Sequence, residues 1–160
     1  MIKALVSNVY GIHGDASLLI SEDTPLRDLI IRFASEPSLR GLFLVDSRQL
    51  FAGVVTRIDL LRWAHFSLSR GKGRREMPVS EFFRIVDARK ARDVASGDLK
   101  ALSVRENDSL QTALDKMLDN EEDVIAVLDA EGRVVGDLRL SEVLTWLLRQ
   151  GYTDEGDAPR

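Results

Sequence analysis

Thr56 and Asp59 have the residue types and the spacing that could bind a phosphorylated ligand. They lie in residues 50–61, where an apolar run containing Gly53 is followed by a helical pattern, which predicts a buried strand leading into a helix. The Thr56 hydroxyl can cap that helix, with Asp59 three residues on. The free N–H groups of a first helical turn also attract anions. The stretch therefore predicts a nucleotide pocket, with a merely capped helix as the alternative interpretation of the same residues.

Other arrangements of chemical side chains are weak. His13 and His65 have no partner at metal-ligand spacing, and the chain has no cysteine. The basic stretch 70–75 lacks the order of a phosphate-binding P-loop, so we read it as a solvated loop or as a phosphate clamp. No pairing of a nucleophile with a base is visible, which makes an enzyme the least favoured class.

Composition restricts the partners. The chain has 160 residues, of which 44% are hydrophobic and 30% charged, with a net charge of −4. This acidic balance argues against nucleic acid as a partner, and no apolar run reaches the length of a membrane span. We expect a cytoplasmic protein that binds neither nucleic acid nor membrane.

The remaining pattern predicts the elements that must position Thr56 and Asp59. Four strands and three helices are expected from short apolar runs, from apolar residues at helical spacing and from capping residues such as Ser109. The strands are expected at 17–21, 42–45, 100–104 and 124–128, and the helices at 24–36, 109–118 and 141–148. Further strands are expected at 50–55 and 133–138, a further helix from 56 to 68, and a short helical or turn segment at 88–97.

The elements repeat along the chain. Aligning Gly53 with Gly136, an offset of 136 − 53 = 83, places Asp59 on Glu142, while the preceding helices match at an offset of 84. The repeat predicts an α/β fold of the α+β type, with two pseudo-twofold β-α-β-β-α units packed as one body. We expect a first unit at 1–69, a linker with a basic loop and short helices at 70–97, and a second unit with a polar tail at 98–160.

With this repeat, the chain resembles tandem CBS domains, also called a Bateman module. The resemblance rests on the paired strands that end in Val45-Asp46 and Leu128-Asp129, and on the segment 53–59, which matches the family signature G-h-x-T/S-x-x-D. It implies regulation by an adenosine ligand (AMP, ADP, ATP, S-adenosylmethionine or similar) in the cleft between the two units, with no obligatory cofactor and no catalysis.

The resemblance also implies roles for individual residues. Asp59 would accept hydrogen bonds from the ribose, Thr56 would donate to phosphate and Arg57 would add charge, within a segment that includes Gly53 and Val55. The base would contact the other unit near these residues: Leu102, Ser103, Val104, Asp123 and Val124.

The second unit departs from the signature. A second, weaker site would consist of Gly136, Arg139 and Glu142, where Arg139 replaces the capping hydroxyl and Glu142 replaces the aspartate. We therefore expect one competent site. In similar proteins two modules pair through the helices that end each unit, so we expect a homodimer and an unidentified effector protein as a further partner. The alternative is a structural dimerisation module with vestigial pockets.

Overall fold

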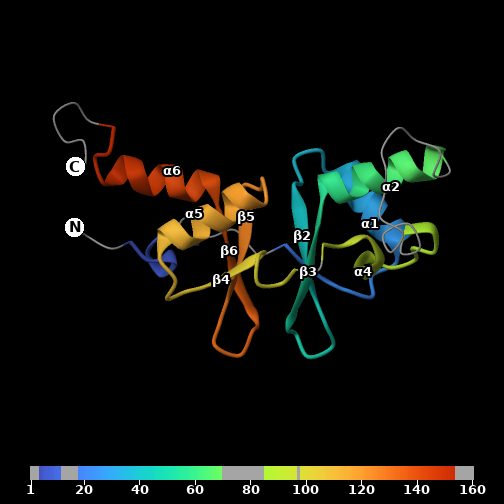
Figure 1. Ribbon diagram of the computed structural model, residues 1–160, viewed down its shortest axis with the longest axis horizontal. Coiled ribbons are helices and arrows are strands. Elements are labelled where there is room, and N and C mark those ends of the chain that lie inside the picture. Colours follow the sequence, from blue (N-terminus) through green and yellow to red (C-terminus); the bar gives the residue numbers. More distant parts are fainter. Residues whose placement is uncertain (1–3, 12–17, 70–84, 97, 154–160) are drawn as a thin grey trace. The chain divides into compact units, whose positions relative to one another are not determined.

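The computed structural model describes residues 4–11, 18–69, 85–96 and 98–153, and the chain forms two compact units (Figure 1). One unit comprises residues 18–99 and is called here the first-repeat unit. The other comprises residues 1–17 and 100–160 and is called the second-repeat unit. No helix in the described part of the chain is long and apolar enough to cross a membrane.

The first-repeat unit contains a three-stranded sheet with the strand order β1-β2-β3. Strand β1 runs parallel to β2, and β2 runs antiparallel to β3. The elements in chain order are β1 (Leu19–Ser21), α1 (Leu26–Ser35), β2 (Gly41–Val45), β3 (Phe51–Thr56), α2 (Arg57–Ser69) and α4 (Ala91–Val94).

The second-repeat unit has the same topology, with the strand order β4-β5-β6 and the same parallel and antiparallel pairings. A short 3-10 helix precedes it. The elements are η1 (Val6–Asn8), β4 (Ser103–Arg105), α5 (Leu110–Asp119), β5 (Val124–Leu128), β6 (Val134–Arg139) and α6 (Leu140–Arg149).

Strand register confirms the predicted repeat. Gly41 pairs with Thr56 in one sheet as Val124 pairs with Arg139 in the other, and each hairpin has an irregularity one residue before the end of its first strand. The change of offset arises between helix and strand, since residues 36–40 connect α1 to β2 but only residues 120–123 connect α5 to β5. Two separate sheets, each with its helices on one side (Figure 1), confirm the predicted α/β fold of two β-α-β-β-α units.

Each unit has its own hydrophobic core. The apolar stripe of α1 buries Leu26 and Leu29 against β2 and β3, as its helical spacing predicts. Helix α5 does the same in the other unit, and the Ser109 hydroxyl caps it by accepting the Thr112 N–H at 3.1 Å.

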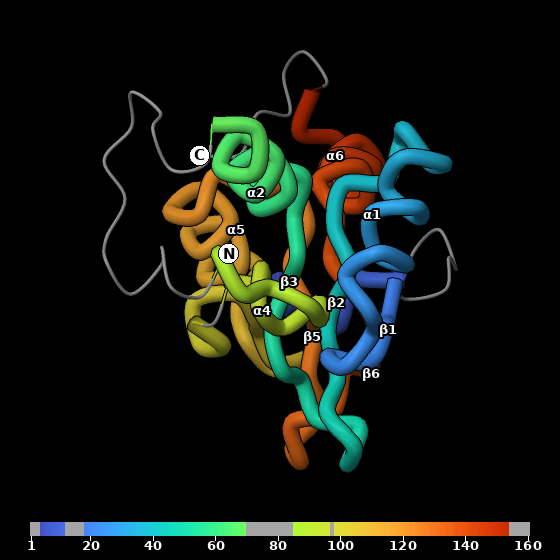
Figure 2. Tube along the Cα trace, turned by 90° about the vertical axis from the view of Figure 1, so that its right-hand side faces the viewer, coloured from blue at the N-terminus to red at the C-terminus, as the bar shows by residue number. Residues whose placement is uncertain are grey.

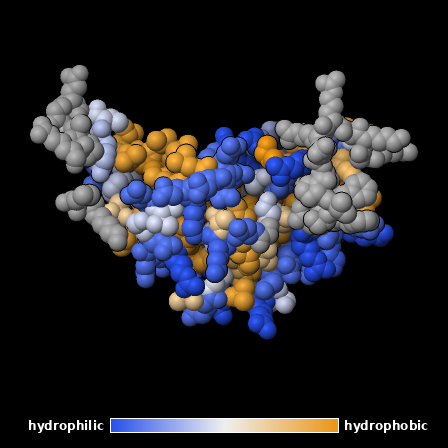
Figure 3. Space-filling model, viewed as in Figure 1, coloured by the Kyte–Doolittle hydropathy of each residue, from blue (hydrophilic) through white to orange (hydrophobic). Residues whose placement is uncertain are grey.

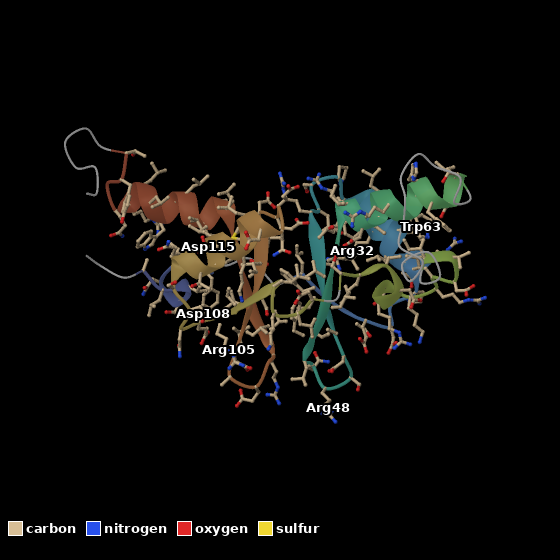
Figure 4. The ribbon with its side chains drawn as sticks, in the orientation of Figure 1. Arg32, Arg48, Trp63, Arg105, Asp108 and Asp115 are labelled. Atoms are coloured by element: carbon tan, nitrogen blue, oxygen red, sulfur yellow. The ribbon has the colours of Figure 1, made fainter. Side chains whose placement is uncertain are left out.

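Two short segments complete the units, and they place the unit boundaries elsewhere than the sequence predicted. Residues 4–11 belong to the second-repeat unit: the Val6 N–H donates to the Asp108 carbonyl at 2.9 Å, at the turn where Figure 4 labels Asp108 and Arg105. Residues 85–96 belong to the first-repeat unit, where the Ala91 N–H donates to the Thr24 carbonyl at 2.8 Å and α4 packs against β3 (Figure 2). The hydrogen bonds that join each segment to its unit link residues far apart in the chain, so local sequence pattern could not assign it.

Candidate functional site

Thr56 and Asp59 form a reciprocal capping pair at the start of α2. The Thr56 backbone N–H donates to Asp59 Oδ2 at 2.8 Å, and the Thr56 hydroxyl lies 3.1 Å from the same oxygen. In return, the Asp59 N–H donates to the Thr56 hydroxyl at 3.3 Å. The capped-helix interpretation is therefore correct for these residues, and it accounts for Oδ2 but leaves Oδ1 for another partner.

That partner is Ser96, which the sequence analysis did not single out. Its hydroxyl donates to Asp59 Oδ1 at 3.2 Å. The Ser96 backbone pairs with Val54 of β3, with the Ser96 N–H donating to the Val54 carbonyl at 2.9 Å. The segment after α4 thus brings a hydroxyl donor to the carboxylate, at the oxygen that the capping pair does not use.

Burial shapes the electrostatics of this cluster. Asp59 is 9% exposed and Thr56 is 7% exposed. Desolvation raises the pKa of the Asp59 carboxyl, although the hydrogen bonds from Thr56 and Ser96 and the charge of Arg62 act in the opposite direction. A buried carboxylate that receives several donors is an acceptor suited to hydroxyl groups of a ligand.

Gly53 fixes how closely the Ser96 segment approaches β3. Its φ of +149° lies in a region that other residues rarely adopt, and a Cβ atom there would lie 3.0 Å from the Ser96 carbonyl oxygen. The glycine of the signature is therefore required by the strand that carries the cluster, whether or not a ligand binds.

The other predicted residues of this site divide between the units. Val55 is fully buried in the core, whereas Arg57 is exposed in the first turn of α2. The residues predicted for the base belong to the second-repeat unit, at the starts of β4 and β5: Leu102, Ser103, Val104, Asp123 and Val124. Their part in a ligand site stays a prediction.

The corresponding position in the second-repeat unit has different chemistry. Glu142, which is 2% exposed, accepts the Arg139 N–H at 3.1 Å, so the carboxylate still caps its helix. The Arg139 guanidinium pairs with Asp137, with Nε 3.1 Å from Oδ1 and Nη2 3.3 Å from Oδ2. Gly136 lies under the ring of Tyr10, whose hydroxyl donates to Glu106.

Backbone hydrogen bonds also show what replaces Ser96 there. The Arg92 N–H donates to the Glu22 carbonyl as the Ser7 N–H donates to the Glu106 carbonyl, which aligns Arg92 with Ser7. Counting four residues on from each makes Gly11 the counterpart of Ser96 in this alignment. Gly11 has no hydroxyl to offer Glu142. The two predicted sites thus differ at three pairs of equivalent positions. These are Thr56 and Arg139, Asp59 and Glu142, and Ser96 and Gly11.

Metal chemistry has no visible basis in the described residues, because no group of three or more His, Asp or Glu side chains there could hold an ion. The basic stretch 70–75 and His13 lie outside the described residues.

Comparison with known proteins supplies the family. The model of the CBS domain matches residues 12–65 and again residues 91–149. The chain belongs to the CBS-domain family. It is a tandem CBS pair, or Bateman module, and the expected resemblance is confirmed. None of the curated protein sequences compared with the chain matches it.

Solved structures agree with this CBS-pair fold. A CBS-domain protein of Thermotoga maritima is 22% identical with a TM-score of 0.71, covering 93% of this chain and 97% of its own. CBSX2 in complex with AMP is 19% identical with a TM-score of 0.66, covering 91% and 97%. The CBS pair of MJ0100, in complex with 5′-methylthioadenosine and S-adenosylmethionine, is 13% identical with a TM-score of 0.63, covering 92% and 98%.

Proposed function

We propose that this CBS pair is a regulatory module that binds an adenosine-containing ligand through the cluster of Thr56, Asp59 and Ser96. One observation carries the proposal: Asp59 Oδ1, the oxygen left over from helix capping, accepts a hydrogen bond from a hydroxyl that is not part of the helix. A ribose hydroxyl can donate to the same oxygen in place of Ser96 or beside it. Adenosine as the ligand class follows from similar CBS pairs, which hold AMP, 5′-methylthioadenosine or S-adenosylmethionine.

The rest of the cluster suits the phosphate end of such a ligand. Arg57 adds an exposed positive charge in the first turn of α2, two residues before Asp59, where the helix dipole also favours an anion. The Thr56 hydroxyl donates to Asp59 Oδ2 in the structure and would have to turn away from it to donate to a phosphate. We propose no catalytic role, since binding and release of a ligand need only these donors and the carboxylate.

The second-repeat unit is proposed to bind such ligands weakly or not at all. Its Arg139 replaces the hydroxyl, its carboxylate is one methylene longer, and Gly11 stands where the first-repeat unit has Ser96. One competent site per chain follows from these three differences.

A thermal-shift panel tests the function directly. We expect AMP, ADP, ATP or S-adenosylmethionine to raise the melting temperature of the wild type, because a ligand at 100 times its Kd stabilises the folded state by about 2.7 kcal/mol. Asp59→Asn should remove the shift and Glu142→Gln should keep it. If none of the four ligands shifts the wild type at millimolar concentration, the proposed function is wrong.

A second candidate function is self-association, and exposed apolar residues on two helices favour it. Ile58 is 49%, Leu61 63% and Leu68 89% exposed on α2. On α6, Leu140, Leu144 and Leu148 follow one another at four-residue spacing and are all exposed, and Figure 3 shows hydrophobic surface where Figure 1 places α6. We propose that a second copy of the chain covers these faces, because a self-complementary contact is the commonest way to bury such a patch.

Other apolar residues of these two helices pack against the cores of their own units. Trp63, labelled on α2 in Figure 4, packs against the core of its own unit. Val143, Trp146 and Leu147 pack in the same way in the other unit. The proposed contact therefore rests on Ile58, Leu61 and the exposed leucines of α6.

A further inference from the structure

The second-repeat unit has an ion pair where the first-repeat unit has its site hydroxyl. Arg139 pairs with Val124 across the sheet as Thr56 pairs with Gly41, so Arg139 stands at the position of Thr56. Asp137 stands two residues earlier on the same strand, at the position of Val54. Exchange of Val and Thr for Asp and Arg at these two positions turns an apolar and a hydroxyl side chain into a salt bridge.

The geometry of the pair is that of guanidinium recognition of an anion. Two nitrogens of Arg139 contact the two oxygens of Asp137, at 3.1 and 3.3 Å. The Asp137 side chain is 7% exposed and the Arg139 side chain 27%. A bidentate contact of this kind has the shape that an arginine also uses to bind a phosphate group.

The charges around the pair oppose a second anion. Glu142 is 2% exposed and lies within hydrogen-bond distance of the Arg139 backbone, so a second buried carboxylate lies near the pair. A phosphate that bound Arg139 through the same two nitrogens would have to compete with Asp137, and it would place a further negative charge beside buried carboxylates, which is costly.

We infer that Asp137 acts as an internal substitute for a phosphate group, which occupies Arg139 and closes the second-repeat unit to adenosine nucleotides. The inference rests on the proposed function, because it treats the cluster of Thr56, Asp59 and Ser96 as the equivalent site that is open to a ligand. Removal of the Asp137 charge then creates an anion site at Arg139.

The test uses Asp59→Ala as the background, so that any binding comes from the second-repeat unit. AMP and adenosine are titrated by calorimetry into this variant with and without Asp137→Asn, a change that keeps the side-chain volume. We expect Asp137→Asn to raise the AMP affinity by about tenfold or more, the scale of a charge-assisted hydrogen bond, and to leave the adenosine affinity unchanged. The gain should shrink as salt is added.

Two further variants keep the result decisive. Adding Arg139→Gln to Asp137→Asn should abolish the gain, because the guanidinium is then absent. If Asp137→Asn does not fold, Asp137→Val with Arg139→Thr copies the residues of the first-repeat unit and should bind AMP. An unchanged AMP affinity in the folded variant, or an equal gain for adenosine, overturns the inference. A wild type that binds no adenosine ligand would contradict the proposed function, and the comparison in the Asp59→Ala background would still decide the role of Asp137.

Discussion

The Ser96 hydroxyl donates to Asp59 Oδ1 at 3.2 Å, although the two residues are 37 positions apart in the chain. Asp59 begins helix α2, and Ser96 ends the segment that follows α4. Residue 97 follows directly, and the second repeat begins soon after it. A ligand that hydrogen bonds to Oδ1 must share this oxygen with Ser96 or displace it. The hydrogen bond thereby links the site carboxylate to the segment that leads from one repeat to the next.

The first prediction concerns the hydrogen bond between Ser96 and Asp59. Ser96→Ala should lower the free energy of unfolding by about 1.5 kcal/mol, at the low end of the range for hydrogen bonds to charged groups, because Asp59 keeps its buried carboxylate but loses a donor. Urea unfolding measures the change. Ser47→Ala, at an exposed turn position, is the control and should change the unfolding free energy by less than about 0.5 kcal/mol. Equal effects at the two serines would show that the hydrogen bond contributes nothing to stability.

The second prediction concerns pH. Burial raises the pKa of Asp59 above the ordinary value of 3.8, so the folded state holds this proton more tightly than the unfolded state does. The contribution of the carboxyl to stability is then fully present below pH 3.8 and is lost as the pH rises through the raised folded value. Asp59→Asn cannot titrate, and its amide oxygen can still accept the Thr56 N–H. It should therefore gain stability relative to the wild type as the pH rises from acid to neutral.

Urea unfolding at several pH values between 4 and 7 tests this expectation. Asp28→Asn, on the exposed face of α1, controls for the general effect of removing a carboxylate. A stability difference between Asp59→Asn and the wild type that does not change with pH would refute the expected cost of the ionised carboxylate.

The third prediction separates the two sites. Asp59→Ala should weaken binding of AMP by about 1–3 kcal/mol, the scale for losing hydrogen bonds to a charged group, and Glu142→Ala should weaken it much less. Calorimetry on both variants gives the comparison. Equal losses at the two positions would mean that both units bind the ligand, contrary to the single competent site proposed here.

The sequence predicted the elements because their signals are local. The stripe of Leu26 and Leu29, the Ser109 cap and the Thr56–Asp59 pair each lie within one helix or one strand-to-helix turn. Because the sequence repeats, the positions of Gly136 and Glu142 in the second unit could be predicted from those of Gly53 and Asp59 in the first. These features define the fold and two residues of the site cluster, Thr56 and Asp59.

Ser96 and the contacts of the second-repeat unit leave no periodic pattern in the sequence. Ser96 follows a four-residue helix, and nothing in the sequence around it indicates a partner 37 positions away. Asp137 and Arg139 alternate along a strand as solvent-facing charges do, so their mutual pairing was not expected. Tyr10 belongs to a segment that the sequence assigned to the other unit.

The fourth prediction compares the two signature glycines. A Cβ at Gly136 would lie 2.9 Å from two ring carbons of Tyr10, so Gly136→Ala should cost about 1–3 kcal/mol of stability through overpacking. In a Tyr10→Ala background that cost should fall by about 1 kcal/mol or more. At Gly53 the opposing atom is the Ser96 backbone carbonyl, so Ser96→Ala should not reduce the cost of Gly53→Ala. Double-mutant cycles from chemical unfolding measure both couplings, and additive effects of Gly136 and Tyr10 would contradict the predicted clash.

The last prediction concerns assembly. Leu144 and Leu148 are 51% and 61% exposed on one face of α6, opposite the buried Val143. Covering them with a second copy would remove this apolar surface from water, so we expect a homodimer at micromolar concentration. Leu144→Glu with Leu148→Glu should shift the molar mass from light scattering toward the monomer, because two charges would have to be buried at the contact. Leu118→Glu, on a still more exposed leucine of α5 (76%), is the control for adding a charge to an exposed leucine and should leave the dimer intact. A wild type that is monomeric at this concentration would refute the homodimer and would leave the apolar face of α6 to another protein.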